Sequence, residues 1–195
     1  MSQGHWDELL QRCHTLTDGP THSARLDAWV ERCRALHAHF VLCRTAAALA
    51  RLHDLFERLP ASEFRGRLGL EVAWLHLEQR DVEAAKRVAA AVPSWTEQSL
   101  PGQLVQVRIE HDTGCFAQAF ERQRALEQRF SDMVLDGVAP LLRAGRQAVR
   151  SGCRQDIAPL SLPLGLALGV MPAWALDRIP GELGGTGFDE FAPKV

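Results

Sequence analysis

Strand-forming patterns are nearly missing from this sequence. Alternation of apolar and polar residues with a period of two is rare, and β-branched residues are few before the C-terminal tail. Helical periodicity instead extends almost everywhere up to about residue 151. Neither glycine nor proline occurs from Thr21 to Leu59, which is long for one globular helix. These features predict an all-α protein.

The chain also lacks an excess of charge of either sign. Its net charge of −2 and pI of about 6.4 provide no global positive field for nucleic acid or an anionic membrane. The N-terminal stretch MSQGHWDELLQR has no basic run followed by an apolar run, so we expect no secretory signal. The apolar fraction of 46% and charged fraction of 24% are typical of a soluble globular protein. We therefore expect a cytoplasmic protein that does not bind nucleic acid.

Cysteines are few, odd in number and scattered, without CxxC spacing. They are Cys13, Cys33, Cys43, Cys115 and Cys153. This pattern suits a reducing compartment better than a disulfide framework. On one helix, Cys33 and His37 point roughly 200° away from His39 and Cys43, at about 100° per residue. The four cannot bind one zinc ion, so we expect no metal and no cofactor.

Signatures of catalysis are absent as well. No local motif pairs a cysteine with a histidine as nucleophile and base. The glycine-rich stretch GELGGTGF at 181–188 follows DRIP rather than a strand, and it lacks the Lys–Ser/Thr of a phosphate loop. The sequence therefore predicts a protein that is not an enzyme and has no catalytic residues.

Apolar stripes at helical spacing divide the first two thirds of the chain. The first stripe consists of Trp6, Leu9, Leu10, Cys13 and Leu16. A second extends from Leu26 to Phe40 and a third from Leu49 to Leu59, with a bend expected near 41–46. We expect a helix at about 63–79 after Ser62, and another helix capped by Ser99 with Pro101 in its first turn. A last helix begins at Pro140 and ends near Gly152.

Two segments of the chain form a sequence echo. RDVEAAKRVAAAV at 80–92 and GCFAQAFERQRAL at 114–126 lie about 34 residues apart. Superposition pairs Ala85 with Ala119 and Val82 with Phe116, and small residues such as the alanines allow helices to approach closely. A fainter third copy lies upstream, around Leu52 and Phe56.

This echo resembles the tetratricopeptide repeat, a helix–turn–helix unit of about 34 residues. Gly114 matches the family's turn glycine, whereas the first helices depart from its pattern of a small residue followed by an aromatic. The resemblance implies a short stack of antiparallel helix hairpins whose first helices line a concave groove. The groove residues that it implies are Leu70, Trp74, Leu77, Leu104, Arg108 and His111. An irregular helical bundle with similar spacings by chance is the alternative.

The C-terminal part carries two further features. Arg143, Arg146, Arg150 and Arg154 form one basic stripe, which can clamp acidic side chains or remain a solvated face. Residues 157–176 form an uncharged apolar segment, although three prolines count against a regular spanning helix. We expect this apolar Pro/Gly-rich tail to pack on the helices of its own chain. The alternatives are that it docks on another protein or inserts into a bilayer. We divide the chain into a helical repeat domain at 1–154 and a tail at 155–195.

The function most consistent with these features is a non-enzymatic adaptor or chaperone. It would hold a peptide or helix of a partner protein, with an acidic peptide as one candidate, in the groove and at Arg143, Arg146 and Arg150. Trp74 and the leucines would bury apolar side chains of the partner, and Arg108 would orient it. The alternatives are a structural subunit that uses the tail and arginine stripe as interfaces, and a metal-binding or enzymatic helical protein built on the cysteines and histidines.

Overall fold

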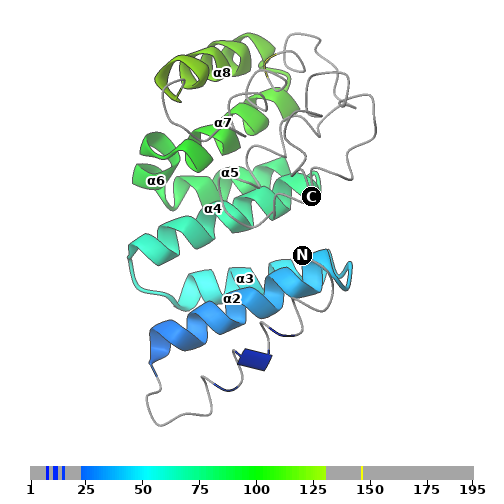
Figure 1. Cartoon of the computed structure of the whole chain (residues 1–195). Coiled ribbons are helices and arrows are strands. Elements are labelled where there is room, and N and C mark those ends of the chain that lie inside the picture. The colour runs from blue at the N-terminus through cyan, green and yellow to red at the C-terminus, as the bar shows by residue number, and fades with distance from the viewer. Residues whose placement is uncertain (1–7, 9–10, 13–14, 16–22, 131–145, 147–195) are drawn as a thin grey trace, which may run out of the picture.

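The computed structural model describes residues 23–130 together with the isolated positions Glu8, Gln11, Arg12, Thr15 and Arg146 (Figure 1). Residues 23–130 contain seven helices and no strand. The helices are α2 (Ala24–Phe40), α3 (Thr45–Arg58), α4 (Glu63–Glu78), α5 (Val82–Ala90), α6 (Pro93–Gln98), α7 (Leu100–Asp112) and α8 (Phe116–Phe130). The prediction of an all-α protein is confirmed for this part of the chain.

Consecutive helices pack in pairs. The most extensive contacts join α2 with α3, α4 with α5, and α7 with α8. Further contacts of α3 with α4, and of α4 with α7, bring one pair against the next. Figure 1 shows the three pairs one above another, with α6 between the second and third.

The helix boundaries follow local capping chemistry. The Ser62 hydroxyl accepts a hydrogen bond from the Arg65 amide (3.2 Å) and starts α4, and the Ser99 hydroxyl accepts one from the Gly102 amide (3.1 Å) and starts α7. Both starts were predicted from the sequence, as was the bend near 41–46, where residues 41–44 separate α2 from α3. The short helix α6 was not predicted, because its six residues are fewer than two turns of periodicity.

The turn between paired helices recurs at the spacing of the sequence echo. Arg80 (φ 61°) and Gly114 (φ 83°) both adopt the left-handed conformation. The backbone hydrogen bonds around them match: Asp81 donates to the His76 carbonyl (2.9 Å), as Cys115 donates to that of Glu110 (2.8 Å). The ends of α4 and α7, and the starts of α5 and α8, therefore lie in one register. The turn before α3 differs, since Arg44 donates to the carbonyl of Ala38.

Small residues lie where helices approach one another closely. Ala85 and Ala119, the small members of the sequence echo, are both fully buried at 0% exposure. At Gly66 an added Cβ would overlap the Trp95 ring, so this glycine lets α6 pack directly on α4. At Gly102 a Cβ would overlap the Trp95 carbonyl oxygen, so α6 also packs tightly against the start of α7.

Several predicted features lie outside the described residues. They are the apolar stripe of Trp6, Leu9, Leu10, Cys13 and Leu16, the closing helix at 140–152 except for Arg146, the apolar segment 157–176 and the boundary between 154 and 155. Within the described part, no helix has both the length and the apolar character needed to cross a bilayer.

Candidate functional site

The six predicted groove residues lie on α4 and α7, and all of them are covered. Leu70, Trp74, Leu77, Leu104, Arg108 and His111 have exposed fractions of 3% or less. The four apolar ones belong to one core cluster. Arg108 joins the two helices, because its Nη2 donates to the Leu77 carbonyl (3.4 Å). In the structure these side chains are therefore part of the protein core, and they do not line an open groove.

The buried guanidinium of Arg108 is neutralised by carboxylates of the same chain. Its Nε donates to Asp112 Oδ2 (2.8 Å), and its Nη1 lies 3.5 Å from Glu78 Oε1. A buried charge is tolerated only with such partners, and charge-assisted hydrogen bonds are the stronger kind. Arg108 therefore links α7 to α4, and the carboxylates of Asp112 and Glu78 compensate its positive charge.

His111 lies beside this ion pair and has one uncompensated nitrogen. Its Nδ1 is 3.1 Å from Asp112 Oδ1, and its ring meets the Phe116 ring edge-on at 5.3 Å between centroids. Burial alone would raise the pKa of Asp112, but the hydrogen bond from His111 and the charge of Arg108 outweigh it and lower that pKa. If Nδ1 carries the proton donated to Asp112, then Nε2 is a buried acceptor without a donor.

Trp74 on α4 also has a buried polar atom without a hydrogen-bond partner. Its ring packs edge-on against His39 at 5.5 Å and stacks with Phe40 at 6.1 Å between centroids. The indole Nε1–H is buried and has no hydrogen-bond acceptor. An unsatisfied buried donor costs about 1–3 kcal/mol, and native structures contain few of them. The first helices of the three pairs, α2, α4 and α7, are here called the inner helices. Among their buried polar atoms without a hydrogen-bond partner are the indole N–H of Trp74 and Nε2 of His111.

A second buried ion pair joins α2 to α4. Arg32 Nε donates to both carboxylate oxygens of Glu71 (3.0 and 2.8 Å), and its Nη2 donates to Oε1 (2.6 Å). Burial raises the pKa of Glu71, and the charge of Arg32 opposes that effect. Sequence reasoning missed this pair, because a separation of 39 residues leaves no periodic signal.

The predicted arginine stripe is only partly described. Arg146 forms an ion pair with Glu127 (3.2 Å), and both belong to the described residues. Arg143 and Arg150 lie outside them. The clamp on an acidic partner therefore stays a prediction, and Arg146 already has a carboxylate beside it.

The cysteine and histidine residues that resembled a zinc site are spread over different environments. Cys33 is buried within α2, whereas Cys43 is exposed in the following turn with φ 52°. His39 Nδ1 lies 3.0 Å from the Thr45 hydroxyl, and burial lowers the pKa of His39. Residues 23–130 and the isolated described positions contain no group of three or more side chains that could hold a metal ion.

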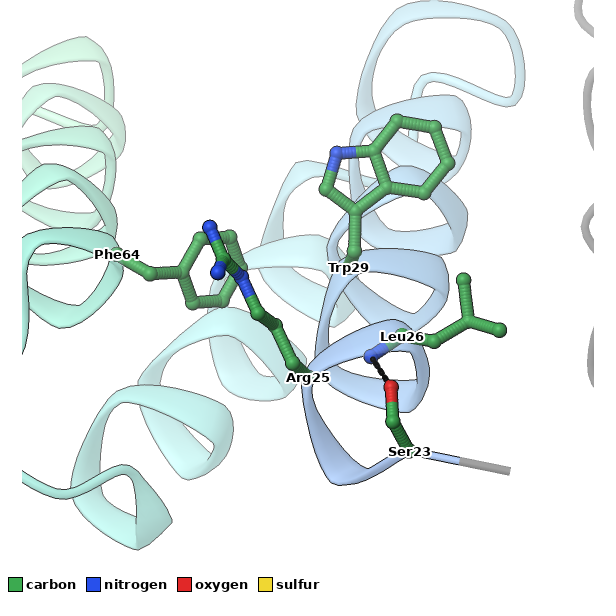
Figure 2. A pocket seen from close by; sticks show the side chains of 5 residues that line it. All are labelled: Ser23, Arg25, Leu26, Trp29 and Phe64. Carbon is green, nitrogen blue, oxygen red and sulfur yellow. Dashed lines mark hydrogen bonds between the residues drawn. The ribbon is translucent and has the colours of Figure 1, made fainter. Parts of the chain in front are cut away.

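One hollow on the surface has an apolar lining that sequence reasoning did not single out. Ser23, Arg25, Leu26, Trp29 and Phe64 line a space of about 310 Å³ at the N-terminal ends of α2 and α4. Figure 2 shows Phe64 reaching from α4 toward Arg25, while Leu26 and Trp29 extend from α2. Trp29 is 40% exposed, which is unusual for so large an apolar side chain in this fold.

Comparison with known proteins identifies no relative. No protein-family model matches the chain, and neither a curated protein nor a solved structure matches it.

Proposed function

We propose that the protein is a non-enzymatic, tetratricopeptide-like adaptor or chaperone, acting in the cytoplasm, that binds a peptide or helix of a partner protein. The recurrence of the turn at the spacing of the sequence echo carries this proposal. Arg80 and Gly114 share a left-handed conformation and the same hydrogen-bond pattern, and small buried alanines follow each of them. Recurring helix pairs stack into a continuous surface, and such surfaces bind other chains.

The inner helices are the proposed peptide site. A peptide backbone offers both a carbonyl oxygen and an N–H group at every residue other than proline. The carbonyl would accept from Trp74 Nε1, and an N–H would donate to His111 Nε2, two buried groups that lack partners. Because both side chains are covered, the peptide would reach them only after local opening of the stack. Arg143 and Arg150 would add attraction for an acidic peptide.

The test is selection of random displayed peptides on the immobilised full chain, followed by binding measurements on variants. Trp74→Phe keeps an aromatic ring and deletes the N–H. One neutral hydrogen bond is worth about 0.5–1.5 kcal/mol, so the Kd should rise by about threefold to tenfold. Trp95→Phe is the matched control, because it makes the same substitution on α6, outside the inner helices.

The comparison of the two variants decides the proposal. Selective weakening by Trp74→Phe, with an unchanged unfolding midpoint, supports a peptide on the inner helices. Equal effects of the two variants, or failure to enrich any peptide, would contradict it.

One observation favours the structural-subunit alternative. The inner side chains are covered, whereas the exposed large hydrophobic residues of the described part are Trp29 and Leu42, near the two ends of α2. A permanent neighbour in a larger complex could cover such residues. Native mass measurement of the protein purified from its own cells would show a defined complex under this alternative, and a chain without permanent neighbours under the adaptor proposal.

A further inference from the structure

The hollow beside Trp29 lies at the N-terminal ends of α2 and α4. Phe64 comes from α4, and the other four lining residues come from the start of α2. The exposed indole of Trp29 and the half-buried Leu26 are on this helix.

The segment before Ser23 has the pattern of a helix with one apolar face. Its described residues Glu8, Gln11, Arg12 and Thr15 are helical and exposed. Arg12 donates to Glu8 (2.6 Å) and the Thr15 hydroxyl donates to the Gln11 carbonyl (3.1 Å), each bond joining positions one helical turn apart. At about 100° per residue, these positions share one face of a helix. On the same helical wheel, the apolar stripe Trp6, Leu9, Leu10, Cys13 and Leu16 falls on the other face.

The connection restricts where this apolar face can bind. Residues 17–22 link the segment to Ser23, which itself lines the hollow. A linker of this length spans at most about 20 Å. A segment held this close has an effective concentration in the millimolar range, well above that of a separate partner or a second copy.

We propose that residues 6–16 dock their apolar stripe on the hollow formed by Leu26, Trp29 and Phe64. The docked segment lies against the N-terminal ends of α2 and α4, which supply the lining of the hollow. It covers the indole of Trp29. The interaction does not depend on the proposed peptide site, which lies on α4 and α7.

A double-mutant cycle in the full chain tests this docking. Leu10→Asp places a charge in the apolar stripe, and Gln11→Asp places the same charge on the exposed face as the control. Trp29→Ser removes the exposed indole, and Leu42→Ser removes an exposed leucine beyond the other end of α2 as its control. The urea midpoint should fall by on the order of 1 M with Leu10→Asp, and clearly with Trp29→Ser, while both controls leave it nearly unchanged.

Coupling between the two changes is the deciding result. Docking predicts that Trp29→Ser has much less effect in the Leu10→Asp background, since the contact is already lost. In a milder Leu10→Ser variant, hydrogen exchange should accelerate in the first turns of α2 and not in α7. Additive losses, or unchanged exchange in α2, overturn the proposal. A dimer that dissociates with Trp29→Ser also overturns it, because a second copy then covers the hollow.

Discussion

Arg80 and Gly114 both have a left-handed backbone conformation, which favours glycine. We therefore predict that glycine at position 80 stabilises the protein and that replacing the glycine at position 114 destabilises it. Arg80 has φ 61°, and the left-handed conformation costs a residue with a Cβ roughly 1–2 kcal/mol. Glycine avoids this cost but loses about 0.4–1 kcal/mol through the greater freedom of the unfolded chain. Arg80→Gly should therefore stabilise the protein by about 0.5–1 kcal/mol.

The reciprocal change and a helical control complete this test. Gly114→Arg should cost about 1 kcal/mol, because φ 83° then belongs to a residue with a Cβ. Arg51→Gly, at an exposed position in the middle of α3, should also cost about 1 kcal/mol through helix propensity. Urea denaturation followed by circular dichroism measures all three, with a constant slope as the check on two-state unfolding.

The sign of the change in unfolding free energy caused by Arg80→Gly decides whether the two turns are equivalent. Stabilisation by Arg80→Gly together with destabilisation by Gly114→Arg confirms the same backbone conformation at both positions. If Arg80→Gly destabilises as much as Arg51→Gly does, residue 80 is not left-handed in solution. The recurrence of the turn, and with it the argument for an adaptor, would then lose its main support.

Three further predictions concern packing and pH. Gly66→Ala should lower the unfolding free energy by about 1–3 kcal/mol in thermal melts, because its Cβ would clash with the Trp95 indole. Gly69→Ala should cost less, because its Cβ would overlap its nearest atom, Phe56 Cε2 at 2.9 Å, by a smaller amount. Ala85→Leu and Ala119→Leu should each cost about 1–3 kcal/mol by overpacking in urea denaturation, and unchanged midpoints would contradict close helix contact. Burial lowers the pKa of His76 below 6.5, so stability should fall as pH drops through 6.5 toward the lower folded-state value, and His76→Leu should reduce that slope in titrated melts.

Periodic and local signals predicted most of the described fold. Ser62 and Ser99 mark helix starts because a hydroxyl that caps a backbone N–H acts on a neighbour close in sequence, and so leaves a local pattern. The sequence echo indicated the turns at Arg80 and Gly114 for a related reason, because each of its two segments follows a polar stretch suited to ending a helix. The helix α6 escaped prediction because six residues carry too little periodicity, although Trp95 on Gly66 makes it part of the packing.

The chemistry of the candidate site was much less predictable. The six predicted groove residues do lie on α4 and α7, but their burial was not predicted. Periodicity indicates which residues share a face of a helix, and it does not indicate what covers that face. The pairing of Arg32 with Glu71 depends on how two side chains 39 residues apart come together. The missing acceptor of Trp74 likewise follows only from its three-dimensional surroundings.

Equivalent positions in the two matching helix pairs carry different chemistry. Trp74 on α4 corresponds to Arg108 on α7, and Leu77 corresponds to His111, at the same spacing as Arg80 and Gly114. An indole stacked on Phe40 thus occupies the place that a guanidinium paired with carboxylates takes in the next pair. The recurrence therefore fixes where the backbone places a side chain and leaves its chemistry free. Under the adaptor proposal, specificity for a partner would depend on the differences between the two pairs. Trp74 and His111, each with a buried polar atom that lacks a hydrogen-bond partner, are therefore the positions to change first.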